Sequence, residues 1–172
     1  MNKTIEDIMT RRSVRRYKPE QITREELDTV LKAGMAAPTA KNLQSPIIIA
    51  IQNKEELARL SKMNAAVMNV DADPFYGAQT VLVVLADANN PNAVPDGALV
   101  MGNLLNAAHA IGLGSCWINR AREVFASDEG KALLKKWGIE GDYIGVGNCI
   151  LGYPDEEPTI KPRKDNYVYY VL

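Results

Sequence analysis

The chain has 172 residues, of which 47% are hydrophobic and 24% are charged. This length and composition favour a single compact domain over residues 1–172, and no run approaches the roughly 20 apolar residues that a transmembrane helix needs. The formal net charge of −1 argues against a nucleic-acid-binding protein, because a nucleic-acid-binding face usually leaves the whole domain basic.

The N-terminus and the cysteines indicate a cytoplasmic protein. Residues 1–10 are polar and helix-like, and they lack the apolar stretch of a signal peptide. Cys116 and Cys149 lie in apolar segments without CxxC spacing, and the chain has only one histidine. We therefore expect buried free thiols in a reducing compartment and no metal site.

Apolar periodicity and capping residues predict alternating helices and strands. Thr23 and Glu26 form a capping box, and Thr4 and Asp7 resemble another. In chain order, the first expected elements are a helix over 3–11, a helix from Thr23 that Pro38 closes, a strand over 46–51, a helix begun by Asn53 and a strand over 80–86. The later ones are a helix capped by Asp96 to about 111, a short strand with Cys116 and Trp117, a helix from Ser127 to Gly138, a strand over 143–151, a loop over 153–166 and an extended apolar tail over 167–172.

The segment from Thr10 to Tyr17 places four arginines and a serine around the end of the first predicted helix. Planar guanidinium groups beside a hydroxyl suit an anionic ligand, phosphate above all. A second basic element, Lys161-Pro162-Arg163, lies near the other end of the chain. Together they predict a phosphate held between distant segments, although solvated charge at a helix C-terminus would also explain the arginines.

Three other features of the sequence bear on its chemistry. The loop over 36–46 holds closely spaced polar groups beside a strand, and ligand sites are often built on such loops, although turn chemistry alone explains its composition. Residues 112–119 do not form a dinucleotide-binding GxGxxG loop, because Trp117 stands where the last glycine is needed. His109, among alanines of a predicted helix, is more typical of a structural histidine. Difficult chemistry here would therefore need an organic cofactor.

Taken together, the motifs resemble the FMN-dependent nitroreductase family. The resemblance is carried by Arg11-Arg12-Ser13-Val14-Arg15 with Tyr17, Ala37-Pro38-Thr39-Ala40-Lys41-Asn42-Leu43-Gln44, Gly112-Leu113-Gly114-Ser115-Cys116-Trp117-Ile118-Asn119 and Lys161-Pro162-Arg163. It implies an α+β fold, a mainly antiparallel sheet flanked by helices. It also implies an intertwined homodimer with FMN at the interface, in which residues 153–172 form a loop and tail that cross to the partner subunit.

The resemblance implies roles for individual residues. The phosphate end would be held by Arg11, Ser13, Lys161 and Arg163, with Arg12 at the phosphate or the ribityl chain. Arg15 would lie near the flavin pyrimidine, where a cation that keeps its proton stabilises the anionic reduced flavin. The isoalloxazine would be approached from the other subunit by Pro38, Thr39, Asn42 and, in the same loop, Gln44. Ile118 and Asn119 would place a backbone N–H near flavin N5.

The implied activity is that of an oxidoreductase in which the flavin, and no catalytic side chain, carries the chemistry. NAD(P)H would reduce FMN, and a small-molecule oxidant such as a nitroaromatic or a quinone would take its place in a ping-pong cycle. A flavin store or redox sensor without turnover would use the same binding residues, and the same fold also supports dehalogenation or flavin destruction. Ser45-Pro46 departs from the Pro-Trp that often follows Gln44 in the family, and we expect no helical lid. No nucleic-acid or membrane partner is expected.

Overall fold

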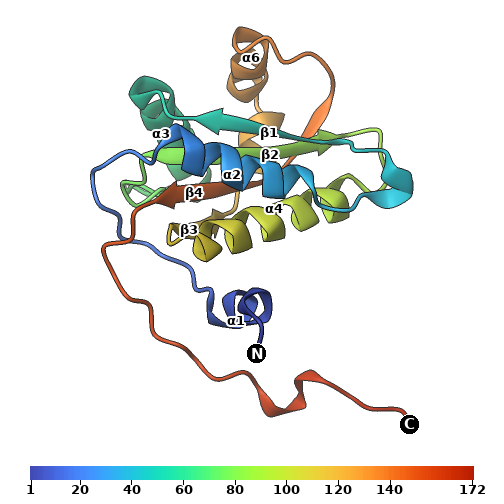
Figure 1. Ribbon diagram of the computed structural model, residues 1–172. Helices are drawn as coiled ribbons and strands as arrows, with labels where there is room; N and C mark the ends of the chain where they lie inside the picture. The colour runs from blue at the N-terminus through green and yellow to red at the C-terminus, as the bar shows by residue number, and fades with distance from the viewer.

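The computed structural model describes residues 1–172, and at its centre is a four-stranded antiparallel sheet in the order β1-β2-β4-β3. The strands are β1 (Pro46–Ile51), β2 (Thr80–Asp87), β3 (Gly114–Ile118) and β4 (Tyr143–Gly152). The α-helices are α1 (Lys3–Thr10), α2 (Arg24–Met35), α3 (Lys54–Met68), α4 (Ala93–Ala110), α5 (Ala121–Ala126) and α6 (Asp128–Lys136), and 3-10 turns cover Ala40–Asn42 and Asp165–Tyr167. This arrangement confirms the predicted α+β fold (Figure 1).

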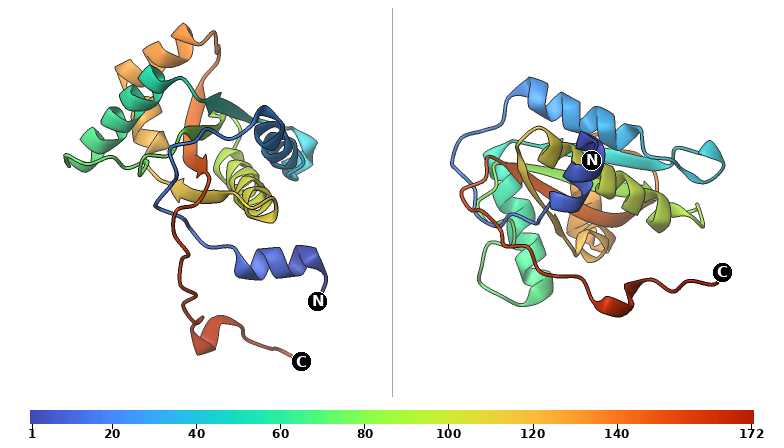
Figure 2. Two further views of the ribbon diagram at one scale, coloured as in Figure 1. Left: turned by 60° about the vertical axis from the view of Figure 1, so that its left-hand side comes forward. Right: turned by 60° about the horizontal axis from the view of Figure 1, so that its bottom comes forward.

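Helices cover both faces of the sheet, as Figure 2 shows: α2 and α4 lie on one face, and α3, α5 and α6 on the other. Strand β2 therefore contributes to two cores, with Val81 and Val83 in the one under α3 and α5 and Leu82 and Val84 in the one under α2 and α4. A strand that is buried on both faces has no polar side to alternate with. This explains the unbroken apolar run of residues 81–86.

Most predicted helix signals are confirmed. The capping box of Thr23 and Glu26 has both of its hydrogen bonds, and Asn53 and Ser127 accept N–H groups at the starts of α3 and α6. Gly138 follows α6 with φ of +73°, a conformation that suits a glycine after a helix. The short helix α5 was not predicted, because its six residues are too few to show a helical period.

The capping box at Thr4 and Asp7 is wrong. Asn2 caps α1 instead, since its side chain accepts the Ile5 N–H at 3.1 Å, and the helix therefore starts before Thr4. Asp7 lies inside the helix and pairs with Lys3, one turn earlier.

Asp96 does not cap α4 either, because the helix begins three residues before it, at Ala93. The side chain is instead buried, and its Oδ1 accepts the N–H of Ala40 at 2.9 Å. The Asp96 carboxylate, which was expected to cap the start of α4, thus holds the loop around Ala40.

Two apolar segments have little of this chain to pack against. On α1, Ile5, Ile8 and Met9 are about half exposed. The tail over 167–172 is apolar, exposed, and runs away from the body of the molecule, as Figures 1 and 2 show. None of the helices combines the length and apolarity needed to cross a lipid bilayer.

Candidate functional site

The arginine-rich segment is held along the open edge of the sheet. Its Val14 N–H donates to the Ser115 carbonyl of edge strand β3 at 3.0 Å, and its Lys18 N–H donates to Tyr153 at 2.9 Å. The Asp155 N–H donates back to Arg16 at 2.9 Å. The segment therefore lies between β3 and the chain that follows β4.

Two glycines let this segment lie close to the sheet. A Cβ on Gly114 would come within 2.9 Å of Val14 Cγ1, and one on Gly152 would come within 2.9 Å of Tyr17 Cδ1. The Tyr17 hydroxyl also donates to the Val14 carbonyl at 2.6 Å. Val14 is buried and Tyr17 packs against the core, whereas Arg15 and Arg16 between them are exposed.

This packing brings the two predicted basic elements together. A cavity of about 590 Å³ is lined by polar and charged residues and Pro158 alone, namely Arg12, Ser13, Arg15, Glu156, Glu157, Pro158, Thr159, Lys161 and Arg163. The first three come from the N-terminal segment, and the rest come from the segment after β4. Segments almost 150 residues apart in sequence therefore form one basic cavity. Figure 1 shows the chain after α1 meeting the chain after β4.

Arg11 lies at the inner side of this cluster. Its guanidinium is half-buried, and its Nη1 has no hydrogen-bond partner. Burial, and next the charge of Arg12, lowers the pKa of Arg11, and Arg163 acts in the same direction. A buried donor without an acceptor is costly, so an anion at this position would satisfy it.

Arg12 and Arg15 differ in whether the guanidinium group is already hydrogen-bonded within the chain. Arg12 Nη1 donates to the carbonyls of Met9 and Arg11 at 2.8 and 2.7 Å, which closes the end of α1. Arg15 is exposed, and only its backbone is fixed, because its N–H donates to Glu156 Oε1 at 2.5 Å. Glu156 was not predicted as a site residue, and no sequence pattern links it to Arg15.

The loop over 38–44 is held in an unusual backbone conformation. Lys41, Asn42 and Gln44 have φ values of 53°, 55° and 51°, and such left-handed conformations are uncommon outside glycine. Thr39 Oγ1 accepts the Gln44 N–H at 3.0 Å, and the buried Asp96 accepts the Ala40 N–H. Strain of this kind clusters at functional sites.

The loop and the basic cavity lie at opposite ends of α4. The loop contacts Asp96 near the start of the helix, whereas Thr10, next to the arginines, contacts His109 near its end at 2.9 Å. These two helical residues are 13 positions apart, or about 20 Å at 1.5 Å per residue. Pro38 and Asn42 are exposed, and Thr39 and Gln44 line a separate cavity of about 380 Å³ between α2 and β1.

The end of β3 is fixed by buried amides. The Asn119 carbonyl accepts from Asn64 Nδ2 at 2.9 Å and from Asn148 Nδ2 at 3.3 Å, and Ile118 also accepts from Asn148 at 3.3 Å. Sequence reasoning missed both amides. The one available signal was a polar residue within the apolar stripe of α3, where Asn64 follows Leu60 and Met63.

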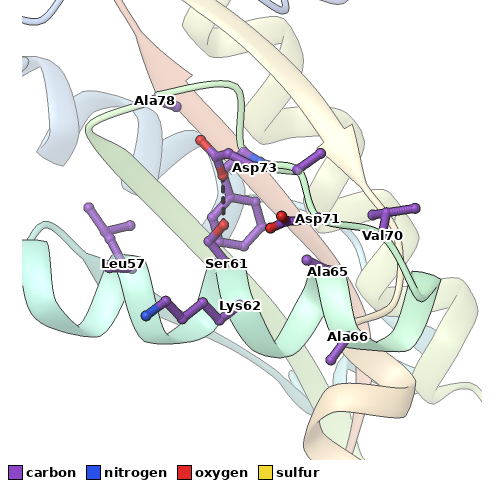
Figure 3. Close-up of a pocket in the computed structure, with 12 residues that line it drawn as sticks. Leu57, Ser61, Lys62, Ala65, Ala66, Val70, Asp71, Asp73 and Ala78 are labelled. Atoms are coloured by element: carbon purple, nitrogen blue, oxygen red, sulfur yellow. Dashed lines mark hydrogen bonds between the residues drawn. The ribbon is translucent and has the colours of Figure 1, made fainter.

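A further cavity, of about 620 Å³, lies between α3 and the loop before β2 (Figure 3). Its most prominent polar group, Asp73, is already satisfied, because it accepts from Ser61 and from the N–H groups of Phe75 and Gly77. No three His, Cys, Asp or Glu side chains gather as metal ligands anywhere in the chain. The basic cavity therefore remains the best candidate site.

Comparison with known proteins agrees with this geometry. The model of the Nitroreductase family matches residues 8–157. A protein of Archaeoglobus fulgidus, provisionally named an NADH dehydrogenase/NAD(P)H nitroreductase, is 32% identical over 97% of this chain and 94% of its own length. The NADPH-flavin oxidoreductase of Vibrio harveyi is 30% identical over 98% of this chain and 72% of its own length. A nitroreductase with bound FMN from Bacteroides fragilis superimposes with a TM-score of 0.92 at 27% identity over the whole of both chains. The chain belongs to the nitroreductase family.

Proposed function

We propose that this protein is an FMN-dependent oxidoreductase that uses NAD(P)H to reduce nitroaromatic, quinone or related acceptors. The names of its relatives support the donor and the flavin. The observation that carries the proposal is the basic cavity, which six cationic or hydroxyl side chains line, together with the neighbouring Arg11, whose buried Nη1 lacks an acceptor. These residues fit a phosphate monoester.

In this proposal, the phosphate of FMN is held by Arg11, Ser13, Lys161 and Arg163, with Arg12 at the phosphate or the ribityl chain. One guanidinium group can donate to two phosphate oxygens at once, and this bidentate contact fixes the orientation of the phosphate as well as adding affinity. Arg15, whose backbone Glu156 fixes, contributes a permanent positive charge farther along the ligand. That charge favours the more negative, reduced state of the cofactor.

Bound FMN would supply the redox chemistry, namely transfer of a hydride equivalent from NAD(P)H and of electrons to the acceptor. The chain's own residues bind and orient the reactants and hold the local charge. The proposal gives His109 no acid–base role, and its ring is hydrogen-bonded to the Thr10 hydroxyl beside α1. We further propose that donor and acceptor use the same open slot in turn.

We propose that the working form is a homodimer, because one chain holds only part of the site. The loop with Pro38, Thr39, Asn42 and Gln44 lies about 20 Å along α4 from the basic cavity, so a second copy must bring it to the flavin. The exposed apolar faces of α1 and of residues 167–172 provide surfaces for that contact. The buried free thiols Cys116 and Cys149 suit a reducing compartment such as the cytoplasm.

The test is anaerobic addition of NADH or NADPH to the FMN-reconstituted, desalted protein, followed by an acceptor. We expect a retained flavin spectrum that bleaches with the nucleotide and returns with a quinone or a nitroaromatic. A retained flavin that never bleaches would favour a flavin store or sensor. A protein that retains no flavin would contradict the proposal.

A further inference from the structure

The two buried asparagines at the end of β3 form a clamp of three elements. Asn64 on α3 is fully buried, donates to the Asn119 carbonyl, and accepts from Arg120 Nε at 2.9 Å. Asn148 on β4 is 1% exposed, and its Nδ2 is shared between the carbonyls of Ile118 and Asn119. The clamp thus fixes two consecutive carbonyl groups.

Two buried amides are an energetically unfavourable way to fill this part of the core. Buried amides lower stability unless their hydrogen bonds are made, and Asn148 Oδ1 has no partner. Both neighbours of Asn148 across the sheet are apolar. Its partner on β3 is Ile118, and its partner on β2 is Val83. Packing alone would favour a leucine or valine there. The role of the amides therefore lies in the two carbonyl groups that they bind.

That role follows from the geometry of the peptide group. In a trans peptide, the carbonyl of one residue and the N–H of the next point in opposite directions. With the carbonyls of Ile118 and Asn119 turned inward, the N–H groups of Asn119 and Arg120 are turned outward together. Neither N–H has an acceptor within the chain, and Arg120 has φ of +76°, as in a backbone nest.

We propose that Asn64 is a positioning residue for the flavin site. Together with Asn148, it aims the N–H groups of Asn119 and Arg120 at an acceptor atom of the flavin ring. This inference rests on the proposed function. It is compatible with the basic cavity, because Asn119 lies four residues along β3 from Ser115, about 13 Å at 3.3 Å per residue. An elongated ligand with phosphate at one end can span that distance.

The test compares Asn64→Leu and Asn148→Leu with Thr80→Val. Thr80 is an equally buried control, whose hydroxyl donates to Gln21 and accepts from Gln52 and makes no contact with the clamp. The measurements are the midpoint potential of bound FMN, the dissociation constant for oxidised FMN, and the FMN-induced shifts of the Asn119 and Arg120 amides in ¹H–¹⁵N spectra. Asn148→Leu removes an unpartnered oxygen, so it remains informative should Asn64→Leu fail to fold.

Flavin N5 accepts a hydrogen bond in the oxidised ring but carries a hydrogen in the reduced ring, so we expect both clamp variants to bind reduced FMN within about threefold of wild type and oxidised FMN at least tenfold more weakly. Tenfold corresponds to a potential about 30 mV more positive for a two-electron couple. The amide shifts should shrink in both variants, and Thr80→Val should change stability only. Unchanged potentials in the clamp variants, or an equal change in Thr80→Val, would overturn the inference. A wild-type protein that retains no FMN would instead remove the proposed function on which the inference rests.

Discussion

Replacing Gly114 by alanine tests how the arginine segment is held on the sheet. The new Cβ would lie 2.9, 3.0 and 3.1 Å from Val14 Cγ1, Cβ and Cγ2, whereas carbon atoms pack favourably at about 3.5–4.0 Å. Rotation of Val14 about χ1 cannot relieve the clash, because its Cβ is one of the atoms in contact. The segment must therefore move off β3 and weaken the bond from the Val14 N–H to Ser115.

We expect Gly114→Ala to lower the free energy of unfolding by about 2–3 kcal/mol, the sum of overpacking and part of one hydrogen bond. FMN should bind about tenfold more weakly, because a displaced segment carries the basic cavity with it. Val14→Ala alone removes two buried methyl groups at about 2 kcal/mol. Since it also removes most of the clash, the double variant should cost about 2 kcal/mol, not the sum. Urea unfolding at one chain concentration and FMN titration measure both quantities. Strictly additive losses, or a Gly114→Ala protein with wild-type stability, would refute the reasoning.

Three further changes separate binding from stability. Arg11→Ala should weaken FMN binding at least tenfold while leaving the unfolding free energy of the flavin-free protein unchanged or higher, because it removes an unpartnered buried donor; a large loss of stability in urea would contradict this. Asp96→Ala leaves the Ala40 N–H without its acceptor and should cost about 1–2 kcal/mol in the same assay, with faster proteolysis of the loop; unchanged cleavage would show that the contact does not hold it. For Glu26, burial raises the pKa, but hydrogen bonds from the Thr23 N–H and the Tyr153 hydroxyl outweigh it and leave the pKa below its usual value. The contribution of Glu26 to the free energy of unfolding is therefore fully present above its unfolded-state pKa of about 4.3. It is lost as the pH falls through the lower pKa of the folded state. Glu26→Gln should flatten that part of the stability profile, and a profile identical to wild type would exclude the assignment.

The sequence was sufficient for the features that depend on local chemistry. The apolar run of β2, the capping box at Thr23 and the glycine after α6 follow from residue type and spacing, and the structure confirms them. The family was also predicted from ordered motifs. The assigned flavin contacts remain predictions, although the structure does bring Arg12, Ser13 and Arg15 to Lys161 and Arg163 around one cavity.

The missed features share a physical cause. Asp96, Asn64 and Asn148 each use a side chain to bind the backbone of a distant segment. Such bonds obey no helical or strand period, so a polar residue in an apolar stretch was the only sign of them. For Asp96, the same residue type is common at helix starts, and the local rule therefore favoured a capping role that the tertiary structure does not use.

The central claim is that one complete flavin site needs two copies of the chain. The most direct measurement is a titration with FMN at several chain concentrations, with the molar mass of the protein determined under the same conditions. The account predicts one FMN per chain in a dimer, and loss of FMN affinity over the concentration range in which the dimer dissociates. A monomer that binds one FMN with undiminished affinity would contradict it.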